Sequence, residues 1–340
     1  MSYIDEFKSV ILGYANDVQK YLSDANKDVC AAATKSAART PPTKAACGKS
    51  DYVYCAEESE EWGTFDKNHK NRARLCYALL YDVCEVTDKK GLVRELFCEE
   101  LKDRETDSFQ GIGDNLRMLT SLLLELGEPS DSELFERAKD ANFDCACGYE
   151  PCKFDVVPLD EFSLCDCINA LYDLDEKELM FKFTDELKNG ELNLDGLMEL
   201  RSIAKWCTKR AEDMEFAVTK IYEIFQNSPE LFDKNSAFNA VHDYVEILIE
   251  KGDPQNASLI FNGQKDTLKC YKRNYYKLGA RLIAGGAAPE TIWADILPYI
   301  KEDMEINMLA PVNRDTILAA AGLANDREMT EKLKTYFDER

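Results

Sequence analysis

The chain has 340 residues, of which 45% are hydrophobic, and its 42 Lys and Arg against 64 Asp and Glu give a net charge of −22 at pH 7. This apolar content is enough for a packed core, so disorder of the whole chain is excluded. A chain this acidic lacks the clustered positive charge that nucleic acids and anionic membranes require, so we expect neither as a partner. It favours a protein or peptide partner instead, and a basic one in particular.

The N-terminal segment predicts a cytoplasmic protein. It carries acids and has no apolar run of the kind found in secretory signals. No later stretch approaches the ~18 uninterrupted apolar residues that a membrane span needs. We therefore expect the thirteen cysteines to stay reduced.

The first predicted element is an N-terminal helix within residues 1–30. Residues 31–60 then read as a loop or linker, because they combine Ala, Thr, Ser and Lys with a Pro-Pro pair and an acidic run. Residues 61–340 are predicted to form an array of helical repeats, with a cysteine-rich insertion at residues 142–158.

Within the predicted array, apolar residues recur at helical spacing, and helix, turn and helix follow one another repeatedly. The expected turn centres are Thr87, Gly127, Asp175, Lys209, Gly252, Gly286 and Asn325. Successive centres are roughly 34 to 48 residues apart, a spacing typical of stacked helical hairpins. Glycine at three of these centres suits a helix that ends in a left-handed conformation. The pattern predicts an all-α, solenoid-like fold of HEAT or TPR type with no sheet of consequence; the alternative is a compact, irregular helical domain.

The insertion predicts a structural zinc site. Five cysteines lie within 23 residues, in the order C-x-C-x4-C-x12-C-x-C, and zinc favours four soft ligands. The candidate ligands are Cys145, Cys147, Cys152 and Cys165, whereas Cys167 shares an apolar stripe and is expected in the core. The alternatives are ordinary buried or surface thiols and a redox pair. Apart from this one zinc ion, no cofactor is expected.

A basic strip in residues 265–281 is the second candidate site. Its cations are Lys265, Lys269, Lys272, Arg273, Lys277 and Arg281. Five of them recur every four residues, so on one helix they form a slowly turning strip. The strip predicts docking of an acidic segment, of a phosphate or of another part of the chain. The alternative is a solvated helix face whose cations pair with acids on the neighbouring hairpin.

Catalytic motifs are not recognisable. His242 lies among apolar residues and is expected in the core, whereas His69 lies in a polar segment with no partner at a recognisable spacing. Acid pairs such as Asp103 and Glu105 read as solvated surface. The chain is therefore expected to be a non-enzymatic, cytoplasmic helical-repeat protein that binds a protein or peptide as a scaffold or adaptor. Two alternatives stay open: an acidic inhibitor or immunity-type protein that neutralises a basic toxin or nuclease, and a metal-dependent sensor or enzyme that uses the Cys145–Cys167 region.

Overall fold

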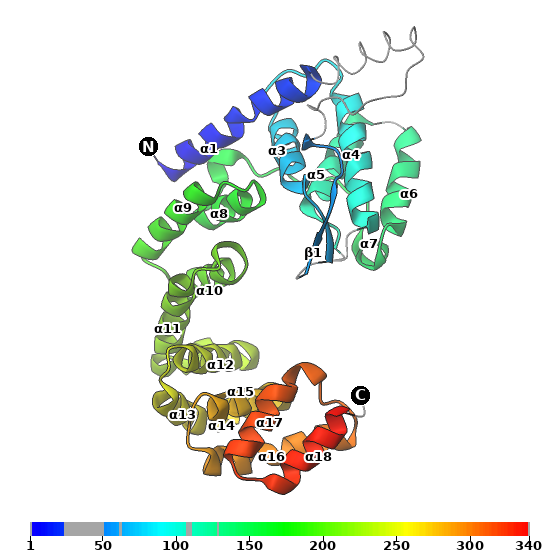
Figure 1. Cartoon of the computed structure of the whole chain (residues 1–340). Coiled ribbons are helices and arrows are strands. Elements are labelled where there is room, and N and C mark those ends of the chain that lie inside the picture. Colours follow the sequence, from blue (N-terminus) through cyan, green and yellow to red (C-terminus); the bar gives the residue numbers. More distant parts are fainter. Residues whose placement is uncertain (1, 24–50, 61–62, 107–110, 128, 339–340) are drawn as a thin grey trace. The chain divides into compact units, whose positions relative to one another are not determined.

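A computed structural model of the chain describes residues 2–23, 51–60, 63–106, 111–127 and 129–338. These residues are mostly helical, with one two-stranded sheet (Figure 1). Neighbouring helices pack as stacked hairpins, so the all-α prediction is confirmed. None of the described helices is long and apolar enough to cross a membrane.

The chain divides into two compact units, Met1–Leu187 and Lys188–Arg340. The boundary between them falls inside residues 61–340, the range predicted as one array. The first unit comprises α1 (Tyr3–Gly13), β1 (Ala56–Ser59), β2 (Gly63–Asp66), α3 (His69–Leu80), α4 (Lys89–Thr106), α5 (Asp114–Leu126), α6 (Ser132–Asp140), α7 (Phe143–Gly148), α8 (Leu164–Asp173) and most of α9 (Lys177–Asn189). Residues 15–23 are also helical, as predicted for the N-terminal segment. Most of the predicted linker lies outside the described residues.

The second unit is helical in all its described elements. It comprises α10 (Leu194–Ile203), a π-helical turn (Ala204–Thr208), α11 (Ala211–Asn227), α12 (Lys234–Glu250), α13 (Pro254–Gly263), α14 (Lys265–Leu268), α15 (Lys272–Ala284), α16 (Pro289–Glu305), α17 (Arg314–Leu323) and α18 (Arg327–Asp338). Each helix from α10 to α12 packs on the next, and α15 contacts both α16 and α17. Contact between helices two places apart is expected when hairpins stack.

The β-hairpin was not expected from the sequence. β1 and β2 pair antiparallel, with Ala56 opposite Asp66 and Ser59 opposite Gly63, so the first strand lies inside the predicted linker. Each strand has only four residues, and Asp66 is the single buried residue of the two strands. A strand without a buried apolar face shows no two-residue apolar period, which is the signal that sequence reading depends on.

The predicted turn centres agree with the backbone. Positive φ angles occur at Gly127, Asp175, Lys209, Gly252, Gly286 and Asn325, which are six of the seven expected centres. In the connection before α4 the residue with positive φ is Asp82, whereas the expected centre, Thr87, lies later in the same connection. A left-handed residue directly after a helix ends it and directs the chain into the next one.

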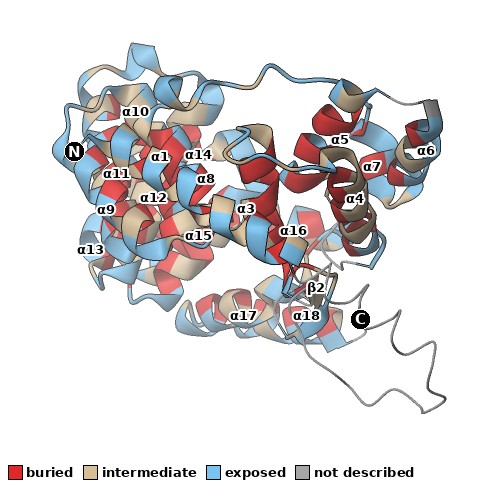
Figure 2. Cartoon of the chain, turned by 90° about the horizontal axis from the view of Figure 1, so that it is seen from above, coloured by how far each residue is buried: buried red, intermediate tan, exposed pale blue. Residues whose placement is uncertain are grey.

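Helices α3, α4 and α5 form the part of the first unit that positions the candidate site. α3 and α4 each pack on α5, and their facing sides are buried (Figure 2). Leu75, Leu96 and Leu116 have no exposed surface. Charged side chains continue the same buried faces, and they form the network described next.

Candidate functional site

A buried ion network joins α3 to α4. Arg72 of α3 is fully buried, and its Nε donates a hydrogen bond of 3.0 Å to Oε2 of Glu100. Its guanidinium also contacts Asp66, the last residue of β2, and lies 3.5 Å from the carboxylate of Asp103. Glu100 and Asp103 are three residues apart on α4 and therefore share one face. Arg72 thus connects the hairpin and both helices.

His69, the first residue of α3, covers the two carboxylates of α4. Its Nδ1 lies 3.4 Å from Oε1 of Glu100 and 3.1 Å from Oδ2 of Asp103. The ring is 36% exposed, whereas both carboxylates are buried. Desolvation lowers the pKa of His69, but Glu100 and Asp103 outweigh it and raise the pKa to about 10. The imidazole is therefore a cation at neutral pH.

The network balances its own charge. Asp66, Glu100 and Asp103 supply three negative charges, and three cations are in contact with them: Arg72, His69 and Arg104. Burial alone would raise the pKa of Glu100, yet the neighbouring cations hold it well below its usual range. Asn115 of α5 donates a hydrogen bond of 3.4 Å to Glu100, which ties the third helix to the network.

Three groups of this network also have the spacing of a metal site. The ligand atoms of His69, Glu100 and Asp103 lie within 4.8 Å of one another, and imidazole and carboxylate are ordinary ligands for divalent ions. Two arginines already contact the same carboxylates, and a metal would have to displace the proton of His69. The arrangement is that of a structural ion network.

This network corrects two interpretations of the sequence. Asp103 was read as solvated surface but is 1% exposed, and His69 has the partners that its local sequence did not show. The missed signal is the periodicity of α4, because Leu96 and Phe97 are followed on the same stripe by Glu100 and Asp103. His242, which was expected in the core, is only partly buried, with its ring 5.2 Å from that of Phe238.

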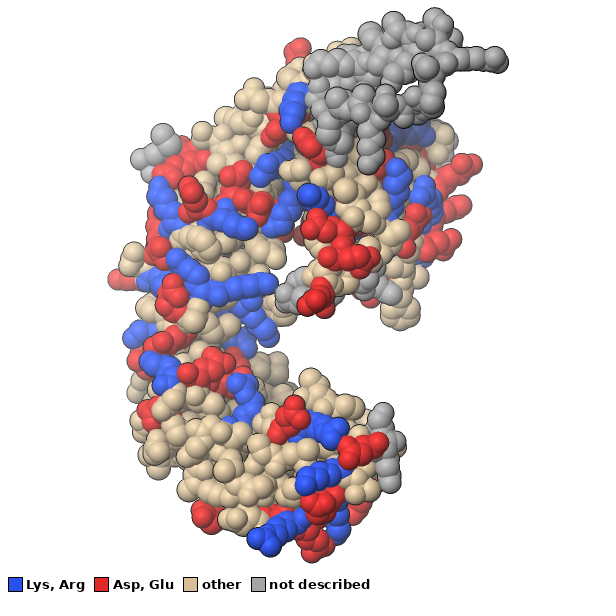
Figure 3. All heavy atoms as spheres, in the orientation of Figure 1, with Lys and Arg blue, Asp and Glu red and all other residues tan. Residues whose placement is uncertain are grey.

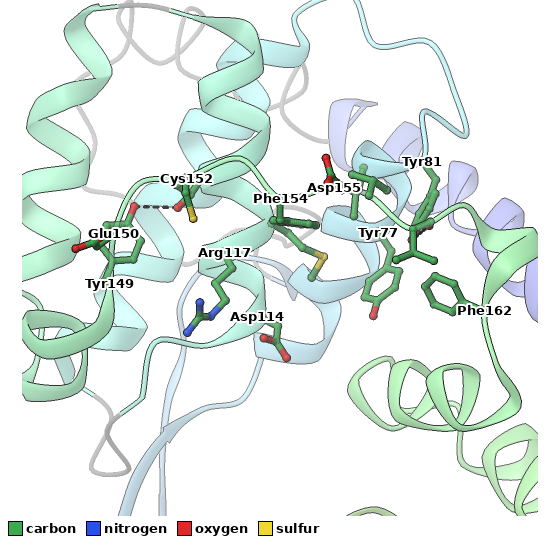
Figure 4. A pocket seen from close by; sticks show the side chains of 15 residues that line it. Tyr77, Tyr81, Asp114, Arg117, Tyr149, Glu150, Cys152, Phe154, Asp155 and Phe162 are labelled. Carbon is green, nitrogen blue, oxygen red and sulfur yellow. Dashed lines mark hydrogen bonds between the residues drawn. The ribbon is translucent and has the colours of Figure 1, made fainter. Parts of the chain in front are cut away.

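A cavity of about 360 Å³ lies in the same unit as the network. Its walls come from α3, from α5 and from residues 149–157, and Phe162 closes one end (Figure 4). The aromatic side chains that face it are Tyr77, Tyr81, Tyr149, Phe154 and Phe162. The charged ones are Asp114, Arg117, Glu150 and Asp155. The volume is typical of a small-molecule or side-chain site.

Part of the cysteine-rich insertion forms one wall of this cavity. Near one end of the segment, the Tyr149 hydroxyl is 2.9 Å from that of Thr120. At the other end, the Tyr81 hydroxyl donates to the carbonyl of Val157 at 3.0 Å. Between these two anchors the chain is extended and largely exposed, and Phe154 is 38% exposed. The wall is held at both ends, with an apolar ring presented between them.

The four candidate zinc ligands differ in their surroundings. Cys145 and Cys165 are buried, whereas Cys147 and Cys152 are exposed. Burial raises the pKa of Cys145, which disfavours the thiolate that zinc binds. Among the described residues, no three of these four sulfurs gather within 4.8 Å of one another. The zinc site stays a prediction. Cys167 is fully buried, where the sequence placed it.

The sequence predicted that the basic strip lies on one helix, but in the structure it does not. It spans α14, a 3₁₀ turn at Lys269–Tyr271, and α15. Four of its cations contact acids: Lys265 pairs with Asp295, Lys272 with Glu302, Arg273 with Asp303, and Arg281 with Glu246. Lys269 lies 5.5 Å from the centre of the Tyr275 ring. These pairs fit the alternative in which the neighbouring hairpins supply the acids, and Figure 3 shows acids and bases interspersed on the surface.

Comparison with known protein families, curated proteins and solved structures gives no match.

Proposed function

We propose that the protein is a non-enzymatic binding protein that holds a peptide segment of a partner protein in the cavity of its first unit. The cavity itself carries this proposal. It is lined by five aromatic rings and open to solvent, and an extended, exposed segment forms one of its walls. Aromatic, concave surfaces of this kind supply most of the binding energy in peptide recognition.

The ion network supports the same proposal because it fixes the walls. Arg72 and Asn115 tie α3, α4 and α5 together, and α3 and α5 supply two of the cavity walls. A wall that is rigid before binding loses little entropy when the ligand arrives. We expect the protein to act in the cytoplasm, as its N-terminal sequence predicts.

Selection from a random dodecapeptide phage library tests this function. Val156 lines the cavity from the extended segment, so Val156→Trp places a large ring into it without replacing a core residue. We expect peptides selected on the wild-type protein to bind this variant at least about tenfold more weakly.

Leu231→Trp is the matched control, because Leu231 is 60% exposed and lies in the second unit. It should bind the selected peptides as the wild-type protein does, and circular dichroism should show both variants folded. Equal binding by the wild-type protein and Val156→Trp, or no selected peptide at all, would refute the proposed site.

A further inference from the structure

The aromatic rings of the cavity are unevenly distributed. Tyr149 lies toward one end, and the other four rings lie toward the opposite end (Figure 4): Tyr77, Tyr81, Phe154 and Phe162. The ring centre of Tyr81 is 6.3 Å from that of Tyr77 and 6.4 Å from that of Phe162. Rings at this spacing attract each other in stacked or edge-to-face arrangements. We call this part of the cavity its aromatic end.

The ring of Phe154 is free to stack on a ligand. Among the described residues it has no contact with another ring or with a cation, and it is exposed. The ring of Phe162, by contrast, stacks on the buried Phe7 at 5.3 Å between ring centres. Each aromatic pair contributes binding energy beyond that of the area it buries. A ligand with a ring of its own can gain that energy at Phe154.

The hydroxyl of Tyr77 is also available to a ligand. The Tyr81 hydroxyl donates to the carbonyl of Val157 at 3.0 Å, and the Tyr149 hydroxyl is 2.9 Å from that of Thr120. Within the described part of the chain the Tyr77 hydroxyl forms no hydrogen bond, although the residue is half-buried. Buried tyrosine hydroxyls usually find a partner. A ligand that carries an N–H group would supply one.

The size of the cavity suits a side chain with two fused rings. An engineered apolar cavity of ~150 Å³ is enough to hold benzene, and the volume of about 360 Å³ is more than twice as large. Leu80, Met118 and Val156 add apolar surface to the walls, and methionine sulfur packs favourably on the edges of aromatic rings. The cavity therefore has room for an indole ring.

We propose that the aromatic end binds the indole ring of a tryptophan of the bound peptide. The ring packs against Phe154, Tyr77 and Tyr81, and its N–H donates a hydrogen bond to the Tyr77 hydroxyl. Indole meets both requirements because it combines a large aromatic surface with one donor and no acceptor. Phenylalanine would leave the Tyr77 hydroxyl without a partner, and an aliphatic side chain would lack the ring contacts. The inference rests on the proposed function and defines the chemistry of its ligand.

Two matched pairs of N-acetyl amino acid amides test these contacts without a known partner, with NMR titration following their binding to the full-length protein. Benzothienylalanine has sulfur in place of the indole N–H, so tryptophan should bind about fivefold more tightly than it does. Cyclohexylalanine is the aliphatic counterpart of phenylalanine, and phenylalanine should bind about threefold more tightly. If apolar burial alone determined binding, the bulkier cyclohexyl group would bind more tightly instead.

Tyr77→Phe tests the hydrogen bond, because it removes the hydroxyl and keeps the ring. It should abolish the preference for tryptophan over benzothienylalanine and leave the binding of benzothienylalanine unchanged. Tyr299→Phe is the matched control. Tyr299 is half-buried in the second unit, and its hydroxyl likewise forms no hydrogen bond among the described residues, so this variant should change nothing.

Phe154→Leu tests the ring contact. It keeps an apolar side chain in the extended segment and should abolish the preference for phenylalanine over cyclohexylalanine. Phe143→Leu is the control, because Phe143 is 71% exposed and lies outside the cavity lining. This variant should keep the preference of the wild-type protein.

The outcomes separate this inference from the proposed function. Peptides from the phage selection should contain a tryptophan and lose about fivefold in affinity when benzothienylalanine replaces it. If tryptophan binds no better than benzothienylalanine, or phenylalanine no better than cyclohexylalanine, the indole site is overturned while peptide binding can still hold. If the amides bind as expected but the selected peptides need no tryptophan, the peptide side chain is overturned as the source. If neither amides nor peptides bind, both proposals fail together.

Discussion

Arg72 has no exposed surface, and its guanidinium contacts the carboxylates of Asp66 and Glu100, which are equally buried. Removing a charge from water costs several kcal/mol, and only the partner charges offset that cost. The value of such a network lies in the balance of its members, because any one of them left alone is a buried, uncompensated charge.

Replacing Arg72 therefore has a large expected effect. Arg72→Met leaves Glu100 and Asp66 without their main cation, and we expect a loss of about 3–5 kcal/mol in the free energy of unfolding. Lys67→Met is the control, because Lys67 is exposed and its ion pair with Glu57, at 3.9 Å, is also exposed. This substitution should lower the free energy of unfolding by less than about 1 kcal/mol. Urea unfolding followed by circular dichroism measures both, and equal losses would contradict the argument.

His69 makes the stability of the first unit depend on pH. Its pKa rises from 6.5 to about 10 on folding, so its contribution is complete below pH 6.5 and is lost as the pH rises through 10. Because the ring is 36% exposed, solvent screening limits the contribution to about 1–2 kcal/mol. The groups that face it are Glu100, Asp103 and Asn115.

His69→Gln should remove this dependence. Between pH 6.5 and pH 10 the wild-type protein should lose about 1–2 kcal/mol more in the free energy of unfolding than the variant does. The difference between the two proteins is the relevant quantity, because tyrosines, cysteines and lysines also titrate near the upper pH. Parallel pH profiles would show that the imidazole does not carry the third positive charge.

At the scale of elements, left-handed residues end several helices. Gly252 has φ +71° and Gly263 has an ordinary φ, and a Cβ added at either would meet nothing within 4 Å. Conformation alone distinguishes these two glycines, so the same substitution should act in opposite directions.

Gly252→Ala should destabilise the second unit by about 1–2 kcal/mol, because an L-residue is strained in the left-handed region. Gly263→Ala should stabilise it by about 0.4–1 kcal/mol, because alanine restricts the unfolded chain. Thermal unfolding of the two variants compares them directly. A shift of the same sign in both would contradict the explanation from backbone conformation.

Helices and their turns could be predicted from the sequence because both leave local signals. Apolar residues at helical spacing marked the elements, and Gly127 and Gly252 marked the ends of α5 and α12. The ion network could not be found in that way, since Arg72 meets Glu100 only after α3 and α4 have packed. Charges within an apolar stripe, as at Glu100, are the one signal that was available.

Only one wall of the candidate binding site could be recognised in the sequence. The insertion stood out by its cysteines, and its composition suggested zinc, whereas the structure shows Tyr149 and Phe154 lining a cavity. The opposite wall comes from α3 and α5, which are distant in sequence. The basic strip stays a predicted binding site, but its placement on one helix was wrong, because the chain leaves the α-helical path at Lys269–Tyr271.

At the scale of the whole molecule, the second unit has a hydrophobic core of its own. Buried residues from Leu197 to Phe337 form one continuous cluster. Trp293 lies within it, and its indole nitrogen donates to Asp326 at 3.0 Å. A unit whose core draws on no residue of the first half has what it needs to fold alone.

Residues 188–340, expressed alone, should therefore be helical and unfold in one cooperative urea transition, with the fluorescence of Trp206 and Trp293 and the circular dichroism changing together. Starting at residue 188 keeps Lys188, which pairs with the buried Asp213 at 2.8 Å. Residues 254–340 are the control: they lack α10 to α12 and so lose Phe238 and Val245 from the core, and they should show no cooperative transition.

If the longer fragment also fails to fold, the two units stabilise each other, and deletions in the second unit should then weaken peptide binding in the first. If it folds, binding depends on the first unit alone, and Gly252→Ala should lower stability without changing affinity.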